Sequence, residues 1–305
     1  MNIANSLNEY KPGLVSVLIP VYNRAEFILQ TLNSVYQQTY KNYEIIVVDD
    51  GSNDGSYEIL ENESEAQKIK LFVHENNSNK GQAASLNVAL SKAQGEYIAV
   101  LDSDDMFEPT KLKAQVDFLK SNQHVGIVYG RGEAVDENNN FLYDISGKFD
   151  VDPSDPNEIL LDCYFLLPQN SLVRHSIYDL AGGFNESYRA AQDHDMLIRL
   201  SEHANIAKIN DYVFKYRRHE NQISSKGLYT RWTNGFKILE AAQKRYPYKK
   251  RTIRKRKGLL HYRMYQVYSA SGIHKNKVKA LLHLGLAGVL DPKRAIDVML
   301  GKEKG

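Results

Sequence analysis

An apolar run leads directly into three carboxylates in the stretch Gly95-Glu96-Tyr97-Ile98-Ala99-Val100-Leu101-Asp102-Ser103-Asp104-Asp105. The run predicts a β-strand that is covered on both faces of a sheet. Ligands of open α/β sheets collect at the carboxyl ends of such strands. Three acids placed there repel one another unless water or a cation compensates, and Mg²⁺ or Mn²⁺ suits such an oxygen-rich site. An aspartate-rich turn without a ligand is the alternative, because Asp tolerates turn geometry.

Length and composition restrict the possible domain number, partners and compartment of the protein. The 305 residues allow one large domain or two smaller ones, and 42% hydrophobic residues suffice for a packed core. The formal net charge of +2 points to no particular partner, and the single cysteine, Cys163, excludes an internal disulfide framework and a cysteine-built zinc site. Residues 1–13 lack the apolar core of a signal peptide, and no run is long enough to cross a bilayer. We therefore expect a cytoplasmic protein.

Strand and helix patterns alternate along the first half of the chain, which predicts a mostly parallel sheet and a nucleotide-binding α/β architecture. The expected strands cover residues 15–20, 43–48, 69–74, 95–101 and 125–129. The expected helices cover residues 25–38, 56–63 and 81–93, and another follows Pro109.

The second half is less regular. From residue 131 to about 167, the Asn, Asp and Gly content favours hairpins and loops over helices. A helix is expected at 193–202, and two more near 258–272 and 276–290. Between residues 245 and 258 eight Lys or Arg residues occur with no acid.

Polar residues follow three of the expected strands, at 20–23, 49–52 and 102–105. Parallel strands bring such ends to one edge of the sheet, so these residues can line one crevice. None of the three ends carries Gly-x-Gly-x-x-Gly or Gly-x-x-x-x-Gly-Lys-Ser/Thr, the two common backbone cradles for phosphate. If the crevice binds a nucleoside diphosphate, a cation held by the acidic cluster must neutralise the phosphates.

Several short motifs follow one another along the chain in a fixed order. They cover residues 17–23, 34–40, 44–52, 79–81 with Asn87, 95–105, 182–185 and 216–219. In this order and spacing the chain resembles the family 2 glycosyltransferases of the GT-A fold, over roughly residues 14–225. The resemblance implies a Rossmann-like central sheet flanked by helices. It divides the chain into an N-terminal polar segment (1–13), a catalytic domain (14–225, with a nucleotide-sugar half at 14–130 and an acceptor half at 131–225) and a basic, helical extension (226–305).

The resemblance also implies a reaction. A sugar would pass from a nucleotide-diphospho-sugar, by expectation a UDP-sugar, to an acceptor hydroxyl with inversion at the anomeric carbon. Mn²⁺ or Mg²⁺ would be the cofactor. The acceptor would be a glycan or a lipid-linked glycan, in bacterial surface polysaccharide or glycolipid assembly.

Carried over by position, the resemblance assigns roles to residues of the expected crevice. Pro20 and Tyr22 would line the base pocket, and Asp50 would accept a hydrogen bond from the uracil imide. Lys80 would lie near the base or the phosphates. Asp102 and Ser103 would approach the ribose. Asp104 would ligate the metal that bridges the diphosphate, whereas Asp105 would have a structural role, capping the segment that follows it.

Inverting transfer needs a base that removes the acceptor proton on the face opposite the leaving group. In the family this carboxylate opens a helix, usually as Glu-Asp, and the matching residues here are Gln192-Asp193. We therefore expect Asp193 to be the base, with a helix cap as its alternative role and Asp195 as the local rival. The departure at Gln192 leaves any role of the first acid in doubt.

His219 occupies a place where many family members supply a histidine to the metal or the diphosphate, so the resemblance makes it a second metal ligand. Its neighbour Arg218 would stabilise the departing diphosphate, although Arg217 and Arg218 could equally be solvated charges. No function is expected for His74, His124 or His175. Trp232 is expected to pack rather than to stack on a sugar.

The basic segment at 245–257 has three interpretations: peripheral contact with anionic lipid, nucleic-acid binding, or a solvated helix face. No nucleic-acid motif accompanies the charges, so nucleic acid is not an expected partner. A sugar-nucleotide nucleotidyltransferase would need a glycine-rich loop after the first strand, which residues 20–24 lack. A nucleotide-sugar or glycan-binding protein without turnover is the remaining rival, and the presence of Asp104 and Asp193 argues against it.

Overall fold

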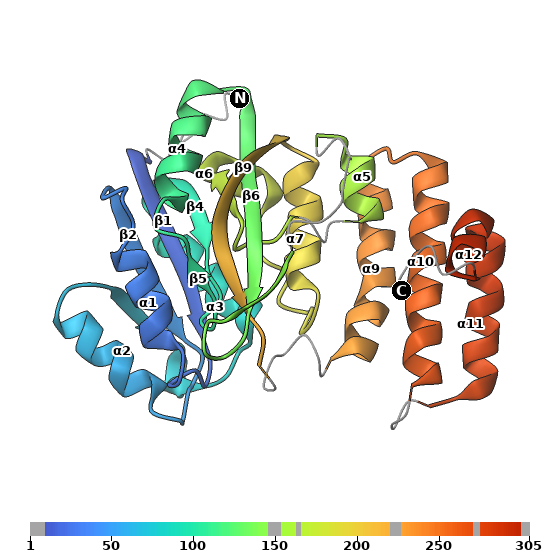
Figure 1. The fold of residues 1–305 in the computed structure, drawn as a ribbon, viewed down its shortest axis with the longest axis horizontal. Helices are drawn as coiled ribbons and strands as arrows, with labels where there is room; N and C mark the ends of the chain where they lie inside the picture. The colour runs from blue at the N-terminus through green and yellow to red at the C-terminus, as the bar shows by residue number, and fades with distance from the viewer. Residues whose placement is uncertain (1–9, 146–153, 163–165, 220–226, 271–274, 300–305) are drawn as a thin grey trace, which may run out of the picture.

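The computed structural model describes residues 10–145, 154–162, 166–219, 227–270 and 275–299. Cys163 and most of the N-terminal polar segment lie outside these ranges. A sheet with flanking helices forms one end of the molecule, and a row of helices from the last third of the chain forms the other (Figure 1).

The alternation of strands and helices predicted for the first half is confirmed. In chain order the elements are β1 (Lys11–Val21), α1 (Ile28–Tyr36), β2 (Tyr43–Asp49), α2 (Ser56–Glu65), β3 (Lys70–Val73), a short 3₁₀ turn (Glu75–Asn77), α3 (Gln82–Lys92), β4 (Gly95–Val100), β5 (Met106–Phe107), α4 (Lys111–Ser121) and β6 (Val125–Val135). Strands β3, β2, β1 and β4 pair in that order, and every pair is parallel. Their carboxyl ends therefore meet at one edge.

The strands of this half are apolar because both of their faces are covered. On one face Val17, Ile19 and Val47 pack with α1, and on the other Leu18 and Ile46 pack with α3. Side chains of α1 that recur every three or four residues point to the sheet: Ile28, Leu32 and Val35. This two-sided burial fixes the strand register and thus the position of the polar residues at the strand ends.

The second half adds a mixed part to the sheet. Its elements are β7 (Phe141–Asp144), α5 (Pro156–Leu161), β8 (Ser171–Arg174), α6 (His175–Ala181), α7 (Gln192–Ser201) and β9 (Asn205–Arg217). The sheet continues from β4 as β8, β6, β9 and β5, and β8 is antiparallel to both of its neighbours. The sequence predicted a mostly parallel sheet: its first four strands are parallel, and β9 again runs parallel to β6, whereas the other pairs of the second half are antiparallel.

Two elements of this half differ from the sequence expectation. Helix α5 lies in a stretch expected to form hairpins and loops: the Asp155 carboxylate accepts a hydrogen bond from the Asn157 N–H, and Pro156 occupies the first turn. Strand β9, which the sequence patterns did not predict, runs for 13 residues beside β6. The hairpin of β6 and β7 around residues 136–140 is confirmed.

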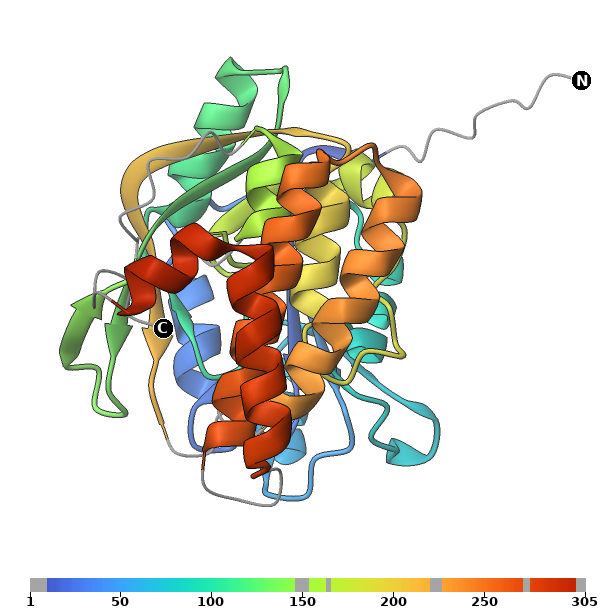
Figure 2. The same ribbon diagram turned by 90° about the vertical axis from the view of Figure 1, so that its right-hand side faces the viewer.

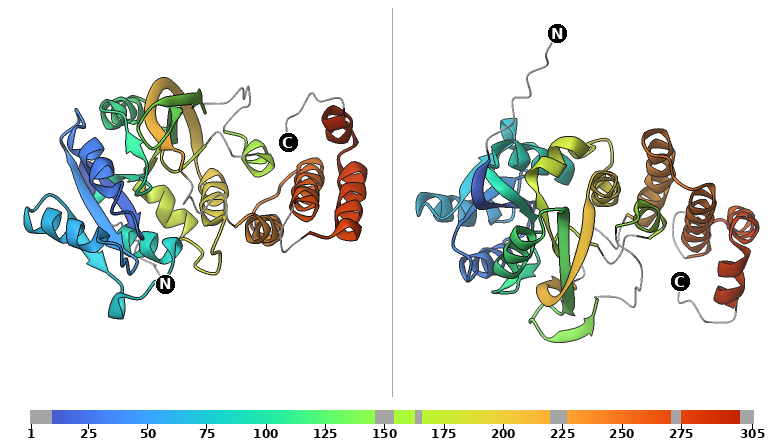
Figure 3. Two further views of the ribbon diagram at one scale, coloured as in Figure 1. Left: turned by 60° about the horizontal axis from the view of Figure 1, so that its bottom comes forward. Right: turned by 90° about the horizontal axis from the view of Figure 1, so that it is seen from above.

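The last third of the described chain is helical: α9 (Leu228–Arg245), α10 (Lys250–Ser269), α11 (Lys277–Leu290) and α12 (Pro292–Met299). Helix α9 packs on α7, α10 on α9, and α11 on α10, so the helices lie in a row that leads away from the sheet (Figures 1 and 3). The sequence prediction missed α9 and started α10 eight residues late, since the basic segment itself is helical. None of the described helices combines the length and the apolar character needed to cross a membrane.

Candidate active site

A cavity of about 730 Å³ opens at the carboxyl ends of β1, β2 and β4. It brings together most of the residues predicted from the sequence: Pro20, Tyr22, Asp50, Asp102, Ser103, Asp104, Asp193 and Arg218 all line it. Lys80 and His219 are not among the lining residues, but each hydrogen-bonds to an aspartate that is. Carboxylates far apart in the sequence thus share one hollow.

Asp50 is fixed by the loop that precedes α3. Its Oδ1 accepts a hydrogen bond from the Lys80 backbone N–H at 2.7 Å, and its Oδ2 accepts one from the Gly81 N–H at 2.9 Å. Gly81 has a φ of +93°, a backbone conformation that residues with a Cβ rarely adopt, so glycine is favoured at this position. His74, for which the sequence predicted no role, lies behind Asp50, with its Nε2 2.9 Å from the Ser85 Oγ and 3.5 Å from Asp50 Oδ1.

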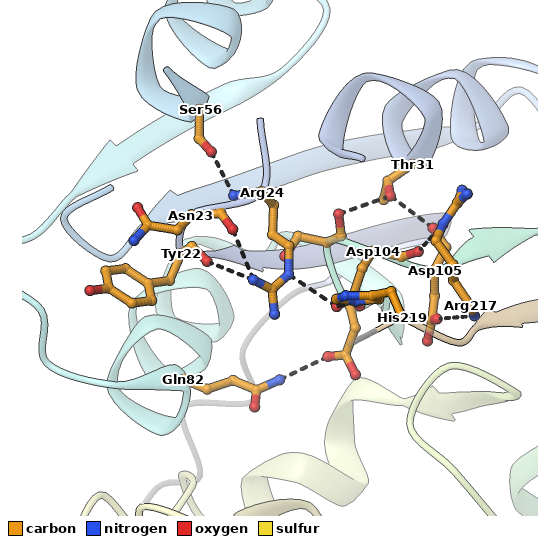
Figure 4. Close-up of polar contacts among 12 residues, drawn as sticks. Tyr22, Asn23, Arg24, Thr31, Ser56, Gln82, Asp104, Asp105, Arg217 and His219 are labelled. Carbon is orange, nitrogen blue, oxygen red and sulfur yellow. Dashed lines mark hydrogen bonds and ion pairs between the residues drawn. The ribbon is translucent and has the colours of Figure 1, made fainter. Parts of the chain in front are cut away.

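One carboxylate oxygen of Asp104 binds two side chains, those of Arg24 and His219. Its Oδ2 lies 3.0 Å from Nε of Arg24 and 3.0 Å from Nε2 of His219 (Figure 4). Burial alone would raise the pKa of Asp104, but the contacts to His219 and Arg24 outweigh it and hold the pKa below its ordinary value. Asp104 is therefore an anion at neutral pH, in a cavity wall where negative charge is otherwise costly.

The donor atoms of this pair suit a divalent cation. Asp104 offers a carboxylate oxygen and His219 an imidazole nitrogen, and these two atoms now hydrogen-bond to each other at 3.0 Å. Among the described residues no group of three or more His, Cys, Asp and Glu side chains is placed to hold a metal. A site of two protein ligands leaves coordination positions for phosphate oxygens and water, as Mg²⁺ commonly requires. Arg24 would have to move from the shared oxygen.

Asp102 is held by amides instead of cations. Gln82 donates to its Oδ1 at 2.8 Å, and Gln169 donates to its Oδ2. Burial, reinforced by the charges of Asp104 and Asp193, raises the pKa of Asp102 to about 7. Asp102 therefore exchanges its proton near neutrality, unlike Asp104 two residues later.

Asp105 and Arg217 support the acidic cluster from behind. The Asp105 Oδ1 accepts a hydrogen bond from the Arg217 backbone N–H, and the Arg217 Nε donates to the backbone carbonyl of Asp104 (Figure 4). Both side chains are fully buried. Asp105 thus has the predicted structural role, but it fastens β9 to the strand end and does not cap the segment after it. Arg217 is no solvated charge, whereas Arg218 is exposed at the cavity wall.

Asp193 lies in the first turn of α7, on the opposite wall. Burial would raise its pKa, but the backbone N–H of His194 and the charges of His194 and Arg231 lower it. Burial lowers the pKa of His194 to about 4, so at neutral pH Arg231 supplies the positive charge. Nη2 of Arg231 lies 2.9 Å from Nε2 of His194. Asp193 is therefore an ionised carboxylate that faces the cavity, as a base must be.

Asp195, the alternative candidate for the base, forms an ion pair with Arg199 instead of facing the cavity. Its Oδ2 accepts hydrogen bonds from Nε and Nη2 of Arg199 at 3.0 and 2.8 Å, and it is buried away from the cavity. Gln192 does line the cavity, and its amide donates to Gln82, which in turn donates to Asp102. The residue at the family's first acid position therefore connects the Asp193 wall to the Asp102 wall.

The sequence analysis missed several lining residues: Arg24, Gln82, Gln169, Arg189 and Arg231. Arg24 directly follows a strand end that was singled out, so its position carried a signal. Gln169 and Arg231 come from segments without a motif, and only the folded chain brings them to the cavity. Trp232 is buried beneath Arg231 and Arg263, in agreement with the expected packing role.

Solved structures share this architecture. A crystal structure of TarS from S. aureus in complex with UDP-GlcNAc superposes with a TM-score of 0.68 at 22% identity, over 92% of this chain and 82% of that one. The mannosyltransferase PcManGT from Pyrobaculum calidifontis, in complex with GDP-Man and Mn²⁺, gives a TM-score of 0.60 at 19% identity, over 95% and 81%. The fold is therefore that of the GT-A glycosyltransferases.

Sequence comparison supplies the family. The family described as Glycosyl transferase family 2 matches residues 16–180. An uncharacterized glycosyltransferase of Rickettsia conorii is 36% identical over 222 residues, which are 70% of this chain and 35% of the relative. The chain belongs to glycosyl transferase family 2. It spans about a third of the length of that relative.

Proposed function

We propose that this protein is a metal-dependent inverting glycosyltransferase that moves a sugar from a UDP-sugar to an acceptor hydroxyl. One observation carries the proposal: Asp50, Asp104 and Asp193, which come from three distant segments, line a single cavity at the carboxyl edge of the sheet. These residues match the positions expected for base recognition, metal binding and proton abstraction.

The donor would lie along the ends of β1, β2 and β4. Pro20 and Tyr22 offer flat surfaces for a nucleobase, and the fixed carboxylate of Asp50 retains lone pairs for a base N–H. Asp102 and Ser103, which also line the cavity, would approach the ribose. The volume of about 730 Å³ suits a nucleotide sugar. The UDP-GlcNAc complex of TarS, which shares the fold, supports a UDP-sugar as donor.

Asp104 and His219 would hold the cation, with Mn²⁺ or Mg²⁺ as candidates; the Mn²⁺ in the PcManGT complex supports this choice. When bound, such an ion supplies positive charge to the diphosphate oxygens as the glycosidic bond breaks. Arg24 and Arg218 line the same side of the cavity and add positive charge for the leaving group.

Asp193 would remove the proton from the acceptor hydroxyl while that oxygen attacks the anomeric carbon. The bond to the diphosphate breaks on the opposite side, so the configuration inverts. The lowered pKa of Asp193 keeps it ionised at neutral pH, so the base is ready when the acceptor binds. We propose a glycan or lipid-linked glycan of a bacterial surface polymer as acceptor and the cytoplasm as location, both on the family resemblance alone.

Two measurements test the proposal. Thermal shift with UDP, GDP and dTDP sugars in the presence of Mn²⁺ should give the largest increase in Tm with a UDP-sugar. UDP release with an acceptor should require Mn²⁺ or Mg²⁺, and Asp104→Asn should reduce it by about a hundredfold or more. Asp117→Asn, on the exposed side of α4, is the matched control and should keep full activity. Donor binding without turnover in the wild type, whatever the acceptor, would identify a sugar-nucleotide-binding protein instead.

A further inference from the structure

Helix α11 exposes an apolar face. Residues at helical spacing along one side are Val278, Leu281, Leu282, Gly285, Leu286 and Val289. Val278 and Val289 are each 78% exposed, and Leu281 is 68% exposed. The other side of the helix packs on α10 through Ala280 and Ala287, and His283 Nδ1 lies 2.9 Å from His261 Nδ1. Within the described residues nothing covers the apolar side, and Ile296 of α12 adds to it with 55% exposure.

This face lies at the end of the molecule farthest from the sheet. Helices α11 and α12 form the outermost layer of the helical row in Figure 1, and they face the viewer in Figure 2. A contiguous apolar surface at this place is not part of the catalytic cavity, and it is unusual for a face that meets only water.

The exposed charges around the face have one sign. The exposed charged residues of α11, α12 and the residues just before α11 are all basic: Lys275, Lys277, Lys279 and Lys293. The acids of this region are less accessible, since Asp291 is buried at the start of α12 and Asp297 is half-buried. An apolar stripe flanked by lysines is the pattern of helices that lie in the interface of an anionic bilayer.

The segment at 245–257, which the sequence suggested for lipid contact, is less available. Arg245 pairs with Glu202 at 3.0 Å, Lys249 pairs with Asp155 at 3.1 Å, and Arg256 is buried and donates to the Leu161 carbonyl. These three cations fasten the helical row to the catalytic part. The other cations of this segment that remain exposed on α10 can add only a secondary contribution to lipid contact beside the apolar face of α11.

We propose that α11 and α12 form a membrane-docking surface that lies flat on an anionic lipid bilayer. Leu281, Leu282 and Val289 enter the acyl boundary, while the flanking lysines meet the headgroup phosphates. A second copy of the chain fits less well, because a two-fold contact would pair this face with itself and so would supply no acidic partners for its lysines. The surface is independent of the proposed donor chemistry.

Vesicle flotation with the full chain tests the proposal. The wild type should float with vesicles of phosphatidylcholine containing about 30% phosphatidylglycerol, and much less with phosphatidylcholine alone or at high salt. The double variant Leu281→Gln/Val289→Gln should lower the partition coefficient by about tenfold or more. Leu180→Gln is the matched control, because Leu180 is 62% exposed on α6, away from α11. The variants should keep the wild-type Tm, since the replaced side chains already face water.

Three outcomes would overturn the proposal. One is a wild type that does not float with anionic vesicles. Another is equal loss of binding in the Leu180→Gln control. The third is a wild type that light scattering shows to be dimeric in solution and that Leu281→Gln/Val289→Gln converts to a monomer, which would assign the face to a second copy. A Lys277→Gln/Lys279→Gln variant should weaken binding severalfold and reduce its salt dependence.

Discussion

The two walls of the cavity hold their carboxylates in different ways. On the sheet wall, Asp50, Asp102 and Asp104 each accept at least two hydrogen bonds from fixed donors. On the helix wall, Asp193 sits in the first turn of α7, where backbone N–H groups and the charge of Arg231 act on it. The sheet wall thus fixes charge in place for a ligand, whereas the helix wall keeps a carboxylate available for a proton. Substitutions in the two walls should therefore affect different properties of the protein.

Asp193→Asn should have the largest effect on turnover. An amide is no base at neutral pH, so kcat for sugar transfer should fall by about a thousandfold. Donor affinity, measured by calorimetry with Mn²⁺, should stay within about twofold, because the donor lies on the other wall. Asp195→Asn is the local comparison: it should lower Tm through the lost pairing with Arg199 while the folded fraction keeps its activity. Full transfer by Asp193→Asn would assign the base to another residue.

Arg217→Met should damage the sheet wall through folding. The guanidinium donates to the carbonyls of Asp104 and Glu137 and to the Gln30 side chain, and these acceptors would lose a buried partner. We expect a loss of about 3 kcal/mol in the free energy of unfolding, measured in urea. Arg218→Met, one residue on and exposed, should change stability by less than about 0.5 kcal/mol and reduce transfer instead. Equal stability loss in both variants would contradict the distinction.

Asp102 should give the metal-free enzyme a pH-dependent stability. Burial and the neighbouring acids raise its pKa to about 7, so between about pH 4 and pH 7 the folded chain holds a proton that the unfolded chain releases. Stability should therefore fall as pH rises through this window and level off above it. In Asp102→Asn the fall in Tm should be shallower, as followed by scanning calorimetry in EDTA. Parallel curves for the two proteins would show that Asp102 does not titrate there.

Gln192→Glu should have the smallest effect, although it restores the family's usual acid. A carboxylate cannot donate to Gln82 as the amide does, and its charge beside Asp193 raises the pKa of the base. We expect kcat at neutral pH to change by no more than about threefold and the acidic limb of its pH profile to move upward. Gln192→Leu separates the two causes, because it removes the hydrogen bond without adding charge.

The parallel half and most of the predicted residues of the cavity were accessible from the sequence for a physical reason. Apolar runs such as 45–48 and 97–101 are local signals, and parallel pairing brings their ends to one edge whatever the loops do. Asp50 and Asp104 follow directly from this rule. The position of Asp193 came from family resemblance, since a carboxylate in the first turn of a helix is equally a cap.

The remainder depended on tertiary contacts that carry no local pattern. Arg24 reaches Asp104 across 80 residues, and Gln169 reaches Asp102 across 67. Helix α9 was missed although Trp232, Ile238, Leu239 and Ala242 recur at helical spacing. Helix α5 was missed for a different reason. Asp155-Pro156 is a local signal for the start of a helix, but the loop-like composition around it obscured the signal.

Helix α9 sets a limit on how far the chain can be shortened. Its first turn brings Arg231 to the cavity, its middle places Ile238 and Leu239 in a core shared with α7, and Gly235 lies directly against Leu260 of α10. A truncation at residue 226 would remove the Arg231 guanidinium from the cavity and expose that core to water. A truncation after α10 would leave both in place while discarding α11. The C-terminal extension therefore has two parts: α9 belongs to the cavity wall and to the core, whereas α11 is an outer layer that can be removed.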